Sequence, residues 1–169
     1  MLRYGLIKEE HLEDIALVVC NVLGHGKNKT AMHLLLETAG AETHRGKVKD
    51  RTVGAGMGIT QFDKLPFQDV KDRCSDRSKE LIKEAFDIYI ELVEWEDLRY
   101  NPLLAMIFTR LKYKKVPSEI PKSIEDRAFY WRKYYNGITT TNKDGSISKG
   151  GKGTEQHYLD ANVQDFRYA

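Results

Sequence analysis

The sequence predicts an α+β domain that is mostly helical and carries a small glycine-rich β region beside a central helix. The chain has 169 residues, of which 41% are hydrophobic, and this is enough for one buried core but too little for two comfortable domains. Apolar residues recur at helical spacing through most of the chain. That spacing disappears between Gly46 and Asp63, where glycines alternate with apolar residues. We therefore expect residues 1–169 to form one domain.

The first helix is expected over residues 9–23, because apolar side chains recur there every three or four residues up to a Gly-His-Gly break. Thr30 can cap a second helix that runs to about Glu42. At about 100° per residue, Glu42 returns to within ~20° of the direction of Leu35, so it is predicted to emerge from the core-facing stripe. Glu37 is predicted to point roughly the opposite way, toward solvent or a neighbouring loop, which makes it the weaker candidate.

The remaining elements follow from the same patterns. Residues 46–63 are predicted to form short strands or a hairpin, since their glycines allow close backbone approach. Residues 136–154 predict a long polar loop, in which the Asp144-Gly145 pair suits a small hairpin. Helices are expected over residues 65–74, 75–98, 102–115, 124–135 and 155–166.

The charge and hydropathy patterns argue against several classes of partner. A formal net charge of +2 is too small to favour nucleic acid, because nucleic-acid-binding domains carry a concentrated positive stripe. The densest basic cluster, Arg110 to Lys115, is interpreted as the solvated end of a helix, with contact to an anionic polymer as the alternative. No apolar run approaches the ~18 residues of a membrane span, and the N-terminus lacks the apolar core of a signal peptide. We expect a monomer made in the cytoplasm.

Neither the cysteines nor the histidines predict a metal site. Cys20 lies in an apolar stretch, where a buried free thiol is the ordinary interpretation and a bridge to Cys74 is the less favoured alternative. The five histidines show no metal-ligand spacing with cysteine or paired carboxylates. The glycine cluster over residues 54–58 lacks the lysine and serine of a phosphate-binding loop. We therefore expect no metal and no cofactor.

The candidate chemistry depends on three carboxyl groups, Glu42 at a helix end and Asp50 and Asp63 among the glycines that follow. A carboxyl that leaves an apolar helix face can keep its proton near neutral pH, whereas carboxylates in a wetter loop stay ionised. Such unequal pairs perform general acid and base catalysis, and they suggest glycoside hydrolysis. The structural alternative is that Glu42 pairs with Arg45 or Arg51 while the two aspartates cap turns.

A resemblance supports the catalytic interpretation. The runs Glu42-Thr43-His44-Arg45-Gly46-Lys47-Val48, then Asp50-Arg51, then Gly56-Met57-Gly58-Ile59-Thr60-Gln61-Phe62-Asp63-Lys64 resemble the catalytic stretch of goose-type lysozymes. They are also similar to the motifs of the soluble lytic transglycosylases. Farther on, Trp131-Arg132-Lys133-Tyr134-Tyr135-Asn136-Gly137 resembles the Ala-Tyr-Asn-Ala-Gly segment of both families. The interval from Glu42 to Asp50 is shorter than in the goose-type pattern, and the following glycine stretch is slightly longer.

The resemblance implies a lysozyme-like fold and a role for each matched residue. Glu42 would be the proton donor, and Asp50 and Asp63 would hold the attacking water or stabilise positive charge on the sugar. Tyr135 would line the substrate-binding site near Glu42. The bound N-acetyl sugar would be contacted by Gly58, Ile59, Thr60 and Gln61.

The expected function is therefore that of a peptidoglycan hydrolase, a muramidase that cleaves the glycan strand between N-acetylmuramic acid and N-acetylglucosamine. The chain resembles lysis or tail-associated enzymes of bacteriophages, so it would act on the cell wall after release or as a virion component. A lytic transglycosylase, which forms anhydromuramyl ends, is the first alternative. A non-catalytic murein-binding virion module is the second, and DNA binding through Arg110 to Lys115 is the third.

Overall fold

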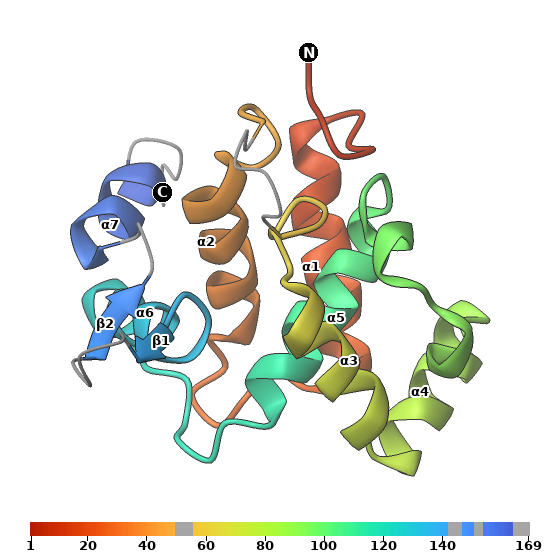
Figure 1. The fold of residues 1–169 in the computed structure, drawn as a ribbon. Coiled ribbons are helices and arrows are strands. Elements are labelled where there is room, and N and C mark those ends of the chain that lie inside the picture. The colour runs from red at the N-terminus through yellow and green to blue at the C-terminus, as the bar shows by residue number, and fades with distance from the viewer. Residues whose placement is uncertain (50–55, 142–146, 151–153, 164–169) are drawn as a thin grey trace.

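The structure is a computed structural model that describes residues 1–49, 56–141, 147–150 and 154–163. This part of the chain is mostly helical, as predicted (Figure 1). Its elements are α1 (Glu9–Leu23), α2 (Ala31–Thr43), α3 (Lys64–Arg73), α4 (Asp76–Phe86), the short 3-10 helices η1 (Ile90–Leu92) and η2 (Trp95–Leu98), α5 (Pro102–Lys114), α6 (Ile124–Tyr134), strands β1 (Ile138–Thr141) and β2 (Ile147–Gly150), and α7 (Glu155–Val163).

Helix α2 is the central element of the fold. It packs against α1, α5, α6 and α7, and Figure 1 shows it between α1 on one side and α7 on the other. The helix is therefore buried on more than one face, with Leu34, Leu35 and Leu36 all inaccessible or nearly so. Thr30 precedes the helix as predicted, but its hydroxyl donates to the carbonyls of Ile120 and Pro121. It thereby ties the start of α2 to the segment before α6.

The prediction for Glu37 is wrong. Its side chain is completely buried, and its two carboxylate oxygens accept hydrogen bonds from Nε and Nη2 of Arg127 at 2.6 and 2.8 Å. The hydroxyl of Tyr158 donates to the same carboxylate at 2.7 Å, and the amide of Asn162 donates to the Glu37 carbonyl at 2.9 Å. Helices α6 and α7 cover the face of α2 that was expected to meet solvent. A buried carboxylate needs such a partner, because an unpaired charge is too costly in the interior.

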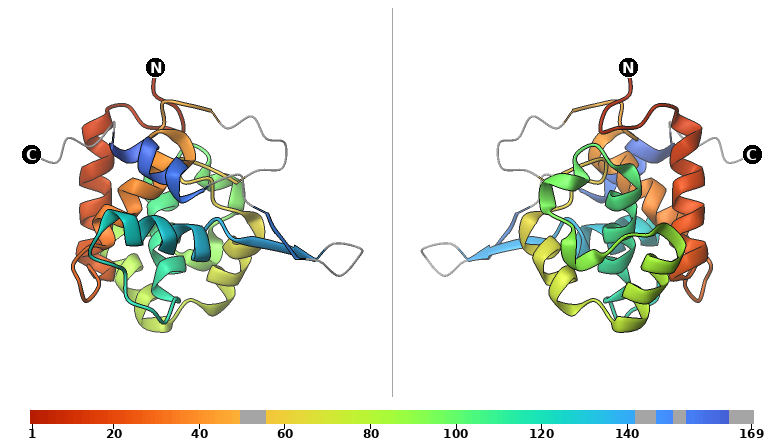
Figure 2. Two further views of the ribbon diagram at one scale, coloured as in Figure 1. Left: turned by 90° about the vertical axis from the view of Figure 1, so that its left-hand side faces the viewer. Right: turned by 90° about the vertical axis from the view of Figure 1, so that its right-hand side faces the viewer.

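The predicted glycine-rich β region is also not seen in the described residues. Between Gly56 and Asp63, Met57 and Phe62 form a single isolated antiparallel bridge that closes a tight turn. The glycines here serve the turn instead of a strand ladder: Gly58 has φ +79°, and a Cβ at this position would lie 2.3 Å from the carbonyl oxygen of Leu98. The described strands lie elsewhere, in the predicted polar loop, where β1 pairs with β2 in an antiparallel hairpin. Figure 2 shows this hairpin projecting from the helical body, and Asp144-Gly145 lies outside the described residues.

The long helix expected over residues 75–98 is broken. Helix α4 ends at Phe86, and Asp87 adopts φ +55°, a left-handed conformation that terminates helices and that aspartate tolerates better than most residues. The chain then forms η1 and η2, and the latter begins with a reciprocal capping box between Glu94 and Asp97. The other predicted helices agree with the structure to within a few residues at each end, except that residues 164–166 of the last one lie outside the described residues.

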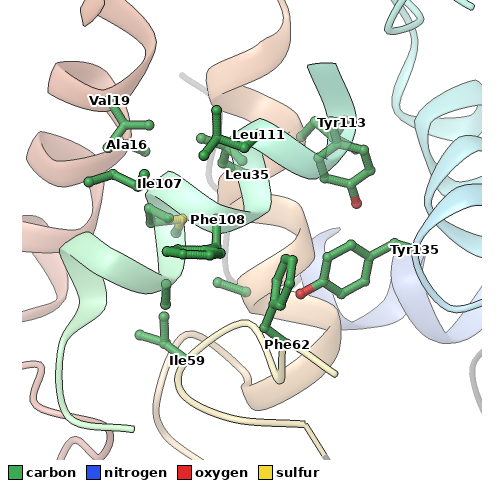
Figure 3. Packing of buried hydrophobic residues seen from close by; sticks show 14 of the residues in the cluster. Ala16, Val19, Leu35, Ile59, Phe62, Ile107, Phe108, Leu111, Tyr113 and Tyr135 are labelled. Carbon is green, nitrogen blue, oxygen red and sulfur yellow. The ribbon is translucent and has the colours of Figure 1, made fainter. Parts of the chain in front are cut away.

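An aromatic cluster in the core joins α5 to the turn that follows residue 56. Figure 3 shows Phe62, Phe108, Tyr113 and Tyr135 near one another in the core. The ring centroid of Phe62 lies 6.0 Å from that of Phe108 and 6.1 Å from that of Tyr135, and both pairs have edge-to-face geometry. This packing fixes the turn against the helices.

Both cysteines are free thiols, and Cys20 is buried as expected.

No helix in the described ranges is long and apolar enough to cross a lipid bilayer.

Gly58→Ala should destabilise the protein by more than about 1–2 kcal/mol, which is the cost of the left-handed conformation for an L-residue. The clash with the Leu98 carbonyl adds to this cost. Gly26→Ala is the matched control, since Gly26 has the same φ of +79° but its nearest neighbour would be Ile120 Cδ1 at 3.8 Å. Urea unfolding of both variants measures the difference. Equal losses would show that the turn can shift away from Leu98.

Candidate functional site

Glu42 lies in the last turn of α2 with its side chain half-buried. The indole Nε1 of Trp131, which is buried on α6, donates a hydrogen bond to Glu42 Oε1 at 3.3 Å. On the α7 side, Nε2 of His157 lies 2.8 Å from the carbonyl oxygen of Ala41. Glu42 therefore does emerge from the packed part of the helix, as predicted. Its surroundings are more polar than the sequence suggested, because an N–H donor faces the carboxyl.

The chain reverses immediately after Glu42 through a strained turn. His44 and Arg45 both have positive φ values, of 48° and 56°, and are followed by Gly46 with φ 84°. Gln61, on the neighbouring turn, has φ 47°. Left-handed conformations are uncommon for residues other than glycine, cost of order 1 kcal/mol each, and gather at functional sites. Their concentration beside Glu42 marks this end of α2 as a candidate site.

The end of α2 and the glycine-rich turn are joined directly by hydrogen bonds. The hydroxyl of Thr43 donates to the Ile59 carbonyl at 2.7 Å, and the hydroxyl of Tyr135 donates to the Thr60 carbonyl at 2.6 Å. The side-chain amide of Gln61 donates to the Gly58 carbonyl at 2.8 Å. All four predicted sugar-binding residues, Gly58, Ile59, Thr60 and Gln61, are buried in this structure. These four residues form the turn beside Glu42, and their contact with a sugar stays a prediction.

Tyr135 lies within electrostatic reach of Glu42, in agreement with its expected position. Burial raises the pKa of Tyr135 well above its ordinary value, and the negative charge of Glu42 raises it further. The ring stacks on Tyr113 with centroids 5.5 Å apart. The phenol therefore stays protonated and acts as a hydrogen-bond donor in this cluster.

Lys112 on α5 brings the two described candidate carboxyl groups, Glu42 and Asp63, into one electrostatic cluster. Its ammonium lies 4.3 Å from the Tyr135 ring centroid and donates to the Tyr135 carbonyl at 3.3 Å. Burial lowers the pKa of Lys112 to about 8, while the charges of Asp63 and Glu42 act in the opposite direction. A cation that lies over an aromatic ring and within electrostatic range of two acids can stabilise negative charge on either of them.

Asp63 is half-buried at the position before α3, and its carboxyl makes no capping hydrogen bond to that helix in the described structure. Burial raises the pKa of Asp63 above its ordinary value, and the Lys112 ammonium partly opposes this increase. The carboxyl is therefore more basic than an exposed aspartate, as a general base requires. Asp50, the third predicted carboxyl, lies outside the described residues.

The interpretation of the basic cluster as a solvated helix end is wrong for several of its members. Arg110 is buried and its Nε donates to the Gly24 carbonyl at 2.9 Å. Lys115 pairs with Asp69, and Lys112 belongs to the cluster around Glu42 and Asp63.

Lys112 is a functional candidate that the sequence analysis did not identify. A signal was present, since Lys112 follows the fully buried Phe108 by four residues and so lies on the same face of α5.

The titration of Lys112 should be visible in the stability of the protein. Between the pKa of about 8 in the folded state and the ordinary value near 10.4, the unfolded chain binds more protons than the folded protein. The free energy of unfolding contributed by this group therefore rises with pH through this window. Relative to Lys112→Met, native stability should increase by on the order of 2 kcal/mol from pH 7.5 to 10. Urea unfolding of both proteins across this pH range measures the increase. A difference in unfolding free energy that stays constant with pH would contradict the burial of Lys112.

No group of three or more His, Cys, Asp or Glu side chains that could hold a metal ion occurs in the described part of the chain. Comparison with protein-family models, with curated proteins and with solved structures finds no match. The functional interpretation therefore depends on the residues and their geometry.

Proposed function

We propose that this protein is a peptidoglycan-cleaving glycosidase with a lysozyme-like fold, in which Glu42 is the proton donor. The observation that carries the proposal is the clustering of Glu42, Asp63 and Tyr135 around the Lys112 ammonium. These three residues are separated in the sequence, and each was assigned to the site by the resemblance. A strained turn beside Glu42 and a half-buried carboxyl fit a catalytic position.

The net charge of the cluster favours a state in which one of its two carboxyl groups, Glu42 or Asp63, is protonated. Two carboxylates and one ammonium carry a net charge of −1, whereas one protonated acid, one carboxylate and one ammonium are neutral. In a partly desolvated site the neutral arrangement is favoured. We assign the negative charge to Asp63 and the proton to Glu42, because Asp63 interacts more strongly than Glu42 with the Lys112 ammonium.

In the proposed reaction, the glycan strand lies along the end of α2. Trp131 donates a hydrogen bond to Oε1 of Glu42, and the Glu42 carboxyl delivers its proton to the glycosidic oxygen. The bond between the anomeric carbon of N-acetylmuramic acid and that oxygen breaks, and the sugar gains oxocarbenium character. A water molecule oriented by Asp63, together with the predicted Asp50, attacks from the opposite face and loses its proton to the carboxylate. The outcome is hydrolysis with inversion.

A lytic transglycosylase is the second candidate, and one observation favours it. The Lys112 ammonium opposes the increase in the pKa of Asp63 that burial causes, so Asp63 is a weaker base toward a water molecule than burial alone would make it. In that reaction the sugar's own hydroxyl replaces water, and Glu42 is the only acid required.

Mass spectrometry of a digest of purified murein tests the proposal and separates the two reactions. Reducing N-acetylmuramic acid ends are expected for the hydrolase, and anhydromuramyl ends would identify the transglycosylase. Binding to murein without release of any soluble fragment would overturn both and would support a non-catalytic virion module. A Glu42→Gln preparation, purified in the same way and used at the same concentration, serves as the control for contaminating enzymes.

A further inference from the structure

A large cavity lies beside the glycine-rich turn and takes no part in the cluster around Glu42. Its volume is about 860 Å³, within the range of small-molecule sites. Its walls come from the N-terminal residues 1–7, the turn after residue 56, and the segment that contains η2. Gln61 lines the cavity, whereas Glu42, Asp63 and Lys112 do not.

The walls of this cavity are fixed by backbone contacts. The amide of Arg3 donates to the Gly46 carbonyl at 2.8 Å, which ties the N-terminal segment to the strained turn after α2. Gly5 has φ +81°, and a Cβ there would lie 2.0 Å from the carbonyl oxygen of Tyr100. The indole of Trp95 is held in place because its Nε1 donates to the Phe62 carbonyl at 2.8 Å. The cavity is therefore formed before any ligand binds.

The side chains that line the cavity share two properties. Every charged side chain among the described lining residues is basic, namely Arg3, Lys49 and Arg99, and all three are exposed. The aromatic lining residues are Tyr4, Trp95 and Tyr100. The nearby acid Asp97 is directed back to its own helix, where it accepts a hydrogen bond from the Glu94 amide at 2.8 Å. Basic groups at the edge and flat rings on the wall suit a ligand with a ring and a negative charge.

We propose that this cavity is a binding site for a small organic anion, in which a ring packs against Trp95 and Tyr100 while a carboxylate or phosphate pairs with Arg3 and Arg99. Guanidinium groups bind either anion through paired hydrogen bonds. The site does not depend on the glycosidase proposal, because neither the proposed acids nor Lys112 lines it; it shares with that proposal only Gly58 and Gln61, two of the predicted sugar-binding residues.

Matched pairs of charged and neutral probes test this site. Adenosine monophosphate is compared with adenosine, and indole-3-acetate with indole-3-acetamide, by calorimetry and by amide NMR shifts of Met57, Gly58 and the Trp95 indole. At least one anion is expected to bind about tenfold more tightly than its neutral analogue, as a charge-assisted hydrogen bond allows. Tighter binding of the nucleotide identifies phosphate as the preferred group, and tighter binding of the indole acid identifies carboxylate.

The same titrations on variants locate the site. Arg99→Met and Arg3→Met should each weaken binding of the preferred anion by about tenfold, while Arg77→Met, an exposed arginine on α4, should leave it unchanged. Thermal melting confirms that each variant is folded. Equal binding of charged and neutral probes, no binding of any probe at millimolar concentration, or insensitivity to Arg3 and Arg99 would overturn the proposal.

Discussion

Glu42→Gln is expected to lower the rate of murein cleavage by about 10²–10⁴-fold, the usual contribution of a general acid. The glutamine oxygen can still accept the hydrogen bond from Trp131, so the local packing should be kept. The amide has no proton to transfer to the glycosidic oxygen. The variant should therefore melt near the native temperature and still bind murein.

Glu84→Gln is the matched control for this substitution, because Glu84 is an exposed glutamate on α4, far from α2 in the sequence. It makes the same replacement of a carboxyl group by an amide at an exposed position and should leave the rate of cleavage unchanged. Initial rates are compared by the decrease in turbidity of a murein suspension at equal concentrations of folded protein. A Glu42→Gln protein that retains native activity would assign the proton donor to another residue.

Arg127→Leu is expected to reduce the free energy of unfolding by about 3–5 kcal/mol, the usual cost of leaving a buried charge without its partner. Arg127 supplies two of the hydrogen bonds to the buried carboxylate of Glu37, and it also donates to the Lys122 carbonyl at 2.7 Å. Removing it takes the guanidinium partner away from the Glu37 carboxylate, although the Tyr158 hydroxyl still donates to the same carboxylate. Urea unfolding followed by circular dichroism measures the loss.

Two further variants give this prediction a control and a rescue. Arg77 forms an exposed ion pair with Glu80 at 3.5 Å, so Arg77→Leu should cost less than about 1 kcal/mol. The double substitution Glu37→Leu with Arg127→Leu should recover part of the lost stability, because it removes the uncompensated charge. A single Arg127→Leu protein as stable as the Arg77→Leu protein would show that α6 and α7 are not held to α2 by this pair.

Local sequence patterns predicted the helices well because apolar spacing reports directly on which side of a helix is buried. They placed α1 correctly and put Glu42 at the end of α2. They could not predict the burial of Glu37, since its partners Arg127 and Tyr158 are 90 and 121 residues away along the chain. A charged residue opposite an apolar stripe has the same pattern whether it meets water or a distant arginine.

The glycine-rich segment shows a second limit. Alternating glycine and apolar residues fit both a strand and a tight turn, and the choice depends on where the backbone hydrogen bonds go. Here the carbonyls of Ile59 and Thr60 accept from the hydroxyls of Thr43 and Tyr135. These side-chain donors replace a partner strand. Tyr135, which the resemblance assigns to the site, lies within electrostatic reach of Glu42, whereas the role of Lys112 depends on burial that no local pattern reveals.

The central claim, that the Glu42 carboxyl breaks a sugar linkage, is tested most directly by counting new glycan ends. Purified murein is incubated with the native protein or with Glu42→Gln, and the muramic acid ends released over time are quantified by mass spectrometry. We expect new ends to accumulate with the native protein and to stay at the background level with the variant. Equal accumulation with both proteins, or none with the folded native protein, would contradict the claim.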